Sequence, residues 1–459
     1  MINIPVGSYW DRPSLVWGLA SGEGESKTIH SPLGPEIQTF RQLGEKELGL
    51  LFSARPTPSV VSMSPCVERL GELLRDHANE IKESIRLATG FNHTDTLDVF
   101  EATLDLIERF EAPSQSQDSG YLAADRQIRV ERLPVGLVGA ILPQNAFLIL
   151  GVTCFLHAYG AGNRVILRSP TVCARTAGIL GRLLLEAGFP ADSFSIVVTD
   201  SEDFISGFLE VSGPRLLHFM GSSQRAASIL SRCFDAGCSA LIDGEGNAWM
   251  FVDRDRDPVE AAKRAWEGAI RYNGQTCTSV NGVFVHPEID IQFRTALRFM
   301  ASETRSNMDG SGVGPLFTPE QATYYEQVVA ESNGRMGRTG LVNGCLFPPT
   351  LVEDPDLDSD LVVKGLFAPA MWMRTGSFDD FVSAWSGNRY PLCAAVCSDS
   401  IAPEEAARRL SGASRIVMNG DPSQEDPMEP WGGYPPCGVN PVGSWGEKYL
   451  RTIQIDGPA

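Results

Sequence analysis

The sequence predicts an α/β fold in which a mainly parallel β-sheet is covered by helices on both faces. Short apolar stretches alternate with helical stretches from residue 136 onward. The apolar stretches are continuous, as expected for strands that are buried on both faces. The alternation restarts after Asp243, which indicates a second α/β lobe. In such folds ligands bind at the carboxyl ends of the strands.

Composition excludes several classes of protein. The chain has 459 residues, 43% of them hydrophobic and 21% charged, which suits a large globular core. A net charge of −19 opposes nonspecific binding to nucleic acid or to an anionic membrane. No apolar run approaches the roughly 20 residues of a membrane span, and residues 1–10 lack the pattern of a signal peptide. We therefore expect a cytoplasmic protein.

The cysteines and histidines favour neither disulfides nor metal sites. The ten cysteines include no C-x-x-C pair, so we expect reduced thiols. The six histidines are isolated, and none has ligand spacing to another histidine or to a cysteine. No metal site is therefore predicted.

The segment before residue 136 predicts two helices and a hairpin. Ser64 and Pro65 suit the start of a helix whose apolar residues recur at helical spacing up to Ile85. A second helix is expected over residues 96–110. Residues 121–135 alternate loosely, as in a strand or hairpin with one wet face.

The two lobes are then predicted element by element. In the first lobe we expect strands at 137–142, 165–167, 194–198 and 216–219, with helices at 147–159 and from Ser169-Pro170 to Gly188. In the second lobe we expect strands at 249–252 and 279–285, a helix at 258–272 and a loop at 273–276. The chain is rich in Gly and Pro from Trp431 and ends in a strand-like run, residues 449–455.

One cysteine stands out by its position. Cys277 follows the Gly-containing loop Asn273-Gly274-Gln275-Thr276 and precedes an apolar strand. Such a cysteine can be partly exposed at a cleft, with backbone N–H groups that favour the thiolate. The alternative is a buried structural thiol, which is the reading we favour for most of the other nine cysteines.

Three further segments lie where strands end. Leu142-Pro143-Gln144-Asn145 places an amide that could donate to an oxyanion, although Pro-x-Asn is also ordinary turn chemistry. Gly221-Ser222 leads from a strand to a helix N-terminus, which suits phosphate. Asp243-Gly244-Glu245-Gly246-Asn247 holds two carboxylates between strands, and a solvated turn is the alternative.

The order and spacing of these pieces resemble the aldehyde dehydrogenase superfamily over roughly residues 60–450. The matching pieces follow the family's order along the chain, and they are Leu133-Pro134-Val135-Gly136-Leu137-Val138-Gly139, Pro143-x-Asn145, Arg168-Ser169-Pro170, Phe219-Met220-Gly221-Ser222, Asn273-Gly274-Gln275-Thr276-Cys277, Gly314-Pro315-Leu316, Phe347-Pro348-Pro349-Thr350-Leu351, Phe367-Ala368-Pro369 and Pro430-Trp431-Gly432-Gly433-Tyr434.

The resemblance implies a mechanism. A thiolate at Cys277 attacks an aldehyde, and the oxyanion is held by the Cys277 backbone N–H and by the amide of Asn145. Hydride passes to NAD or NADP, and water or coenzyme A releases the acyl group. The cofactor would lie on a Rossmann-type lobe with its phosphates near the helix after Gly221-Ser222.

Several positions depart from the family pattern. The family's Glu base, 34 residues before the cysteine, is Asp243, one methylene shorter, so Glu245 could substitute for it. The family's Glu before Phe367 is Gly365, which predicts looser placement of the nicotinamide. Arg168 replaces the family's Lys, and Thr171 replaces an acid. This loss of negative charge predicts that NADP is tolerated.

These likenesses define the remaining predictions. The cofactor-binding residues expected from the resemblance are Leu142, Pro143, Gln144, Arg168, Ser169, Thr171, Gly221, Ser222, Gly244 and Phe367. Residues 1–111 and 136–243 would form the cofactor-binding domain and 244–430 the catalytic domain. Residues 112–135 and 431–459 would form an oligomerisation element of a homodimer or homotetramer.

Substrate and acyl acceptor stay open. We expect a small aldehyde, in a pocket lined near Phe147, His157, Trp266 and the loop before Trp431. Gly244-Glu245-Gly246-Asn247 also resembles the Gly-x-Gly-Asn of coenzyme A-acylating aldehyde dehydrogenases, so release to coenzyme A is one alternative. The other is a family member that binds a nucleotide or a partner without turnover.

Overall fold

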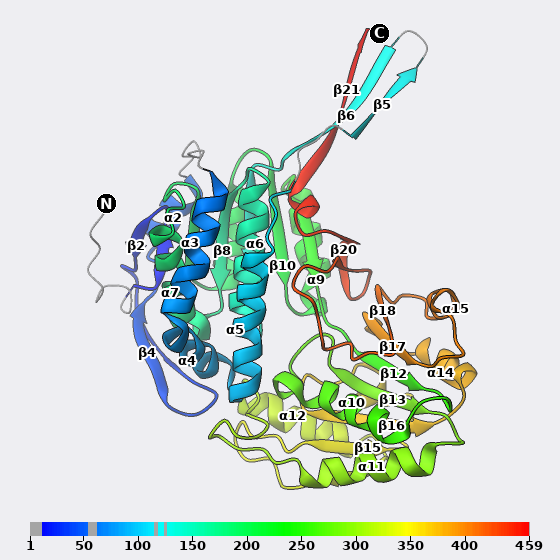
Figure 1. Cartoon of the computed structure of the whole chain (residues 1–459). Coiled ribbons are helices and arrows are strands. Elements are labelled where there is room, and N and C mark those ends of the chain that lie inside the picture. Colours follow the sequence, from blue (N-terminus) through cyan, green and yellow to red (C-terminus); the bar gives the residue numbers. More distant parts are fainter. Residues whose placement is uncertain (1–11, 54–61, 114–117, 124–125, 459) are drawn as a thin grey trace.

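The computed structural model describes residues 12–53, 62–113, 118–123 and 126–458. Two α/β lobes form the body of the molecule, and a three-stranded sheet projects from it (Figure 1). The fold class predicted from the sequence is therefore confirmed. Residues 1–11 of the expected cofactor-binding domain, and residues 114–117 and 124–125 of the expected hairpin, lie outside the described residues.

The first lobe is built on a nine-stranded sheet with the order β19-β20-β11-β10-β7-β8-β9-β1-β2. Its strands are β1 (Ser14–Val16), β2 (Leu19–Ser21), β7 (Leu137–Ile141), β8 (Arg164–Ser169), β9 (Phe194–Val198), β10 (Arg215–Met220), β11 (Ser239–Asp243), β19 (Trp431–Gly433) and β20 (Gly438–Gly443). Five of them, in the order β9-β8-β7-β10-β11, are parallel. This is the Rossmann-type order, and its direction reverses between β7 and β10.

Helices cover both faces of this sheet. Val138 and Ala140 of β7 pack against the helices of one face, and Leu137 and Ile141 pack against the other. The covering elements of the first face are α3 (Met63–Asp76), α4 (Ala78–Thr89), α5 (His93–Glu108), α6 (Phe147–Gly160), η1 (Thr171–Cys173) and α7 (Ala174–Glu186). Those of the second face are α2 (Glu45–Ser53), α8 (Ser201–Glu210) and α9 (Ser223–Asp235).

The helix expected from Ser64 to Ile85 is two helices. His77 ends α3 with φ −104° and ψ 16°, and its N–H donates to the carbonyl oxygens of Leu73 and Arg75. The chain then restarts as α4, which ends at Gly90 in the left-handed region. No Gly or Pro marks the break at His77, so the apolar spacing alone could not reveal it.

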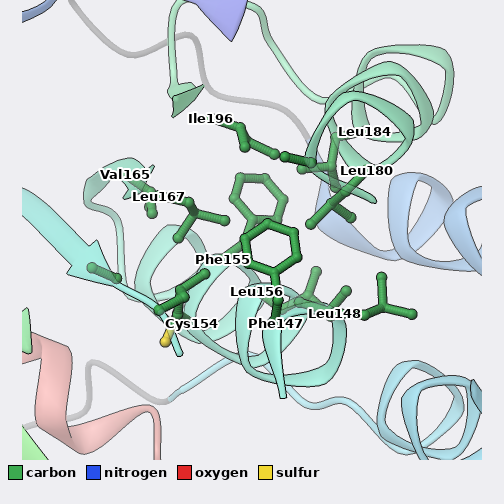
Figure 2. Close-up of a cluster of buried hydrophobic side chains, with 14 of the residues drawn as sticks. Phe147, Leu148, Cys154, Phe155, Leu156, Val165, Leu167, Leu180, Leu184 and Ile196 are labelled. Carbon is green, nitrogen blue, oxygen red and sulfur yellow. The ribbon is translucent and has the colours of Figure 1, made fainter. Parts of the chain in front are cut away.

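Helix α6 is the centre of the first lobe's core. It is apolar on nearly every side, because α5 and α7 and the sheet surround it. Phe155 stacks on Tyr159 and meets Phe189 and Phe194 edge to face. Figure 2 shows these α6 side chains pointing toward Val165 and Leu167 of β8 and toward residues of α7. This packing fixes the end of β7, from which the expected site residues follow.

The second lobe repeats the layered design. Its seven-stranded sheet has the order β14-β15-β16-β13-β12-β17-β18, and only β14, at the edge, is antiparallel. The strands are β12 (Ala248–Val252), β13 (Val280–Val285), β14 (Arg335–Arg338), β15 (Thr350–Glu353), β16 (Ala370–Thr375), β17 (Cys393–Cys397) and β18 (Arg415–Met418). The helical elements are α10 (Pro258–Ile270), η2 (Arg271–Gly274), α11 (Asp290–Glu303), α12 (Pro319–Ala330), α13 (Asp360–Val363), α14 (Phe378–Trp385) and α15 (Pro403–Arg409).

The projecting sheet has the order β21-β6-β5 and is antiparallel. It consists of β5 (Asp118–Ala123), β6 (Arg126–Pro134) and β21 (Leu450–Pro458), with η3 (Glu447–Tyr449) before β21. A separate pair, β3 (Ser26–His30) and β4 (Glu36–Arg41), lies beside the first lobe (Figure 1). The boundary expected at residue 431 does not match the pairing, because β20 adds to the first sheet beside β11.

Candidate active site

A cavity of about 650 Å³ lies where the strand ends of the first lobe face loops of the second lobe. Ten of the fourteen site residues expected from the sequence line it, and they are Pro143, Gln144, Asn145, Gly221, Ser222, Asp243, Gly244, Glu245, Cys277 and Phe367. Segments far apart in the chain meet here because parallel strands end at one edge of the sheet.

Four expected cofactor residues do not line the cavity. Leu142 is buried, and its N–H donates to the Arg168 carbonyl. Ser169 is buried, and Thr171 begins η1. Arg168 lies at the end of β8 and donates from Nε to the Thr199 carbonyl at 3.0 Å. Arg168, Ser169 and Thr171 lie at the end of the neighbouring strand β8, whereas Leu142 directly follows β7, and none of the four lines the cavity.

The loop before Cys277 has an unusual backbone. Tyr272, Asn273 and Gly274 have φ values of 52°, 57° and 65°, so three successive residues are left-handed. A Cβ on Gly274 would lie 2.1 Å from the Ala368 carbonyl oxygen, which requires glycine there. Such strain persists only where the surroundings impose it.

Buried amides hold this loop in place. The Asn273 side chain donates to the carbonyls of Gly90 and Pro315 and accepts from the N–H of Gly314 at 2.7 Å. The Gln275 amide accepts from the N–H of Phe317. The Asn-Gly-Gln motif therefore fixes the backbone that presents Cys277.

Cys277 differs from the other cysteines. All ten are free thiols, and eight of them are buried. Cys277 and Cys345 are partly exposed, and only Cys277 lines the cavity. The expectation that its surroundings favour the thiolate is not met. Burial and the negative charges of Glu425 and Asp243 raise the pKa of Cys277 well above its ordinary value, against the lowering effect of its backbone N–H.

Asn145 lies in the turn between β7 and α6, on the same cavity as Cys277. Within the described part of the chain, its side-chain amide makes no hydrogen bond, whereas the neighbouring Gln144 donates to the Ala88 carbonyl at 2.7 Å. The amide of Asn145 is therefore available to a ligand in the cavity.

Asp243, at the end of β11, is held by three side chains. Its Oδ2 lies 2.6 Å from Nε2 of His218, and its Oδ1 accepts from the Trp431 indole at 3.2 Å. The Asn440 amide donates to both oxygens, at 2.8 and 3.0 Å. Burial favours a raised pKa, but the hydrogen bonds from His218 and Asn440 and the charge of Lys448 outweigh it and lower the pKa of Asp243.

Glu245 lies over the N-terminus of α9. Its Oε2 accepts from the backbone N–H of Ser223 at 3.0 Å, and the Ser222 hydroxyl lies 3.4 Å from Oε1. The Ser223 hydroxyl accepts from the N–H of Glu245 in return. The phosphate position expected at Gly221-Ser222 thus carries an internal carboxylate.

Gly365 explains one departure from the family pattern. Its φ is +71°, and a Cβ there would lie 2.5 Å from Oδ1 of Asn247. Asn247 is buried and donates to the Val362 carbonyl. A glutamate at position 365 would be strained in this backbone, so the local conformation favours glycine there.

The sequence analysis missed Glu425. It lies in residues 419–430, between β18 and β19, and it lines the cavity with Asp426 and Glu429. Its Oε1 accepts from the hydroxyl of Thr278 at 2.6 Å, next to Cys277. Desolvation by the cavity walls raises the pKa of Glu425 to about 7, although its side chain is exposed to solvent and the Thr278 hydrogen bond and the charge of Arg415 oppose the rise.

The expected pocket neighbours are only partly correct. The loop before Trp431 lines the cavity, as do Ile149, Leu150 and Thr153 of α6. His157 is instead buried beside Phe110, and burial lowers its pKa to about 4. Trp266 is buried and donates to Thr304. The helical side chains that face the cavity could not be separated from those that face the core by position alone.

The cavity fits a nicotinamide dinucleotide. The α9 N-terminus already accepts an anionic group, the carboxylate of Glu245, and the cavity runs from there to Cys277. Residues toward such a cofactor would be Pro143, Gln144, Gly221, Ser222, Gly244 and Phe367. Among the described residues no group of three or more His, Cys, Asp or Glu is placed to hold a metal ion. No helix within the described ranges is long and apolar enough to cross a membrane.

A Rossmann-type sheet that shares one cavity with a cysteine of a second lobe defines a class: nicotinamide-dependent oxidoreductases that react through a thiol. The Aldehyde dehydrogenase family model matches residues 59–454. The chain belongs to the aldehyde dehydrogenase family, and it is an NAD(P)-dependent enzyme that oxidises aldehydes.

Individual relatives are distant in sequence and close in fold. Benzaldehyde dehydrogenase YfmT of Bacillus subtilis is 26% identical, over 72% of this chain and 70% of its own length. Vanillin dehydrogenase of Corynebacterium glutamicum is 27% identical, over 85% of this chain and 83% of its own. The solved structure of an E. coli NADP dependent enzyme has a TM-score of 0.90 at 19% identity, with both chains fully covered.

Proposed function

We propose that this enzyme oxidises a small aldehyde to the carboxylic acid through a thioester on Cys277, with water as the acyl acceptor. One observation carries the assignment. Of the two partly exposed cysteines, Cys277 is the one that lines the cavity, and it shares this cavity with the amide of Asn145. A thiol and an uncommitted amide donor on one cavity are the groups that acyl chemistry on cysteine needs.

The residues would act in sequence. Cys277 loses its proton, and its sulfur bonds to the aldehyde carbon. The developing oxyanion accepts hydrogen bonds from the Asn145 amide and the Cys277 backbone N–H. The bound nicotinamide supplies the hydride acceptor. Water then attacks the thioester, and the carbon–sulfur bond breaks.

Asp243 and Glu245 remain the bases predicted from the sequence. A base must reach within about 3 Å of its water, directly or through one more water. The three side-chain donors around Asp243 and the hydrogen bonds that Glu245 accepts at α9 argue against a free oxygen on either carboxylate.

The apolar lining of the cavity favours an aldehyde whose body is apolar. On the substrate side it is lined by Val99 and Ala102 of α5, by Ile149 and Leu150 of α6, and by Trp431. The relatives named benzaldehyde and vanillin dehydrogenase make aromatic aldehydes the first compounds to test.

Either NAD or NADP is proposed as the cofactor. Arg168 lies at the end of β8, and the charges of Asp200 and Arg225 both affect its pKa, which burial lowers. The positive charges of Arg168 and Arg225 suit a 2′-phosphate, and the negative charge of Asp200 opposes it. An NADP Kd far weaker than that for NAD would argue against this.

The test is nicotinamide absorbance with a panel of aliphatic, aromatic and amino aldehydes. NAD and NADP are tested separately, each with and without coenzyme A, beside a Cys277→Ala control. We expect turnover without coenzyme A that the control lacks. Turnover that needs coenzyme A would move the enzyme to the acylating class, and equal turnover in the control would exclude Cys277 as the nucleophile.

Assembly and location are also proposals. The sheet β21-β6-β5 extends away from both lobes (Figure 1) and offers an edge to a second copy of the chain. We propose a homodimer or homotetramer in the cytoplasm. Light scattering that gives a monomer mass would contradict this assembly.

A further inference from the structure

We propose that Glu425 is the general base of this enzyme, and that it takes the proton of the water that releases the acyl group from Cys277. The inference rests on the proposed thioester at Cys277. Glu425 lies in residues 419–430 of the second lobe, the loop before Trp431, which the sequence analysis expected only to line the pocket.

One carboxylate oxygen of Glu425 is free to accept a hydrogen bond from water. Within the described residues, Glu425 has a single hydrogen bond, from the Thr278 hydroxyl to Oε1, and its Oε2 accepts none. Two neighbouring acids of the same loop are each paired with an arginine: Asp426 with Arg109 at 2.7 Å and Glu429 with Arg415 at 3.2 Å. Of these three carboxylates, Glu425 is the one that no arginine of the described residues pairs with, and its Oε2 can accept a hydrogen bond from water.

Glu425 lies on the cavity near Cys277. Thr278, which donates to Glu425, directly follows Cys277 in the chain. Glu425 and Cys277 line the same cavity, and the charge of Glu425 acts on the thiol more strongly than that of Asp243. The Glu425 side chain is open to the cavity, so water reaches it.

The basicity of Glu425 also suits this role. A general base works best when its pKa lies near the working pH. The pKa of Glu425 is raised to about 7, whereas that of Asp243 is lowered. Of these two carboxylates, Glu425 is the stronger base.

The proposed step is hydrolysis of the thioester on Cys277. The water oxygen bonds to the thioester carbonyl carbon while one of its protons passes to Oε2 of Glu425. The carbon–sulfur bond then breaks, its electron pair stays on the Cys277 sulfur, and the proton returns to that sulfur. The product is the carboxylic acid, and nothing is oxidised or reduced in this step.

The experiment compares Glu425→Gln with the native enzyme by rapid mixing, using an aldehyde that the native enzyme oxidises. We expect a burst of one reduced nicotinamide per active site at close to the native rate, followed by steady-state turnover that is about 100-fold slower. Hydroxylamine, which needs no base to attack a thioester, should restore turnover and yield the hydroxamate. Glu425→Asp should retain more activity than Glu425→Gln.

A matched control is Glu404→Gln, which removes the same charge from an exposed residue of α15 that does not line the cavity. It should keep both the burst and the steady-state rate. The native kcat should rise with pH through about 7, and Glu425→Gln should lose this dependence.

Three results would overturn the inference: steady-state turnover of Glu425→Gln within threefold of native, loss of its burst together with its turnover, or a raised KM for cationic aldehydes alone. Failure of the proposed function looks different, because native enzyme would then show no burst and Cys277→Ala would not differ from it.

Discussion

The carboxylates on the two walls of the cavity differ in the number of hydrogen bonds that they accept. On the first-lobe wall, Asp243 and Glu245 are held by hydrogen bonds from His218, Trp431, Asn440 and the α9 N-terminus. On the second-lobe wall, Glu425 has one donor, Thr278. Carboxylates that share a cavity therefore need not share a role. The number of donors at each one decides whether it stabilises the structure or is available for chemistry.

The largest effect expected from this comparison concerns stability. Asp243→Asn leaves the donors of His218, Trp431 and Asn440 without their anion, and it should lower the free energy of unfolding by about 3 kcal/mol at pH 7. Urea denaturation measures this. Since the folded pKa of Asp243 is lowered, its contribution is present above its unfolded pKa of about 3.9 and is lost as the pH falls through the folded value.

The native enzyme and Asp243→Asn should therefore approach each other in stability in acid. If Asp243→Asn is instead as stable as native at pH 7 and loses its steady-state turnover about 100-fold with an intact burst, Asp243 is the base and the comparison between the walls fails.

The second effect concerns Thr278, whose hydroxyl is the single donor to Glu425 on the second-lobe wall. A hydrogen bond to an ionised carboxylate lowers its pKa, so Thr278→Val should raise the pKa of Glu425. The rise of kcat with pH should then move upward by about one unit, and kcat at pH 7 should fall about fivefold. The rate should recover at higher pH.

A pH profile of kcat from 5.5 to 9 checks the Thr278→Val prediction. Thr276→Val is the matched control, because the Thr276 hydroxyl contacts Ser279 and not Glu425. An unchanged pH profile in Thr278→Val would show that this hydroxyl does not set the ionisation of the base.

The smallest effect concerns Glu245. Its carboxylate lies where a cofactor phosphate would meet α9, so Glu245→Gln should tighten NAD binding about threefold, the size of one charge at a helix N-terminus. Calorimetric titration of NAD in a Cys277→Ala background measures it. Glu210→Gln, at the far end of α8, should bind NAD as the parent does. Weaker binding in Glu245→Gln would mean that Glu245 supports the cofactor.

The fold was largely predictable, because each parallel strand is a continuous apolar run. The strand expected at 194–198 is found unchanged as β9, and the helix expected at 147–159 is α6 with one more residue. The break at His77 was missed because it depends on one backbone conformation rather than on a residue type.

The site was predictable where one segment carries the chemistry. Cys277, Asn145 and the strand ends follow local motifs, and they meet as expected. Glu425 was missed because it is 148 residues from Cys277 and sits among other acids, where a solvated loop is the simplest reading. Its neighbours are paired with Arg109 and Arg415, and only tertiary contacts distinguish it from them.

The pairing of β20 with β11 has a consequence for biosynthesis. The strands that carry most of the first sheet are complete by residue 243, yet Asp243 receives its donors from Trp431 and Asn440, nearly 200 residues later. A ribosome-bound chain that ends before residue 431 contains Cys277 and Asn145 but leaves this carboxylate without those partners. Asp243 therefore gains these hydrogen bonds only when synthesis has almost ended.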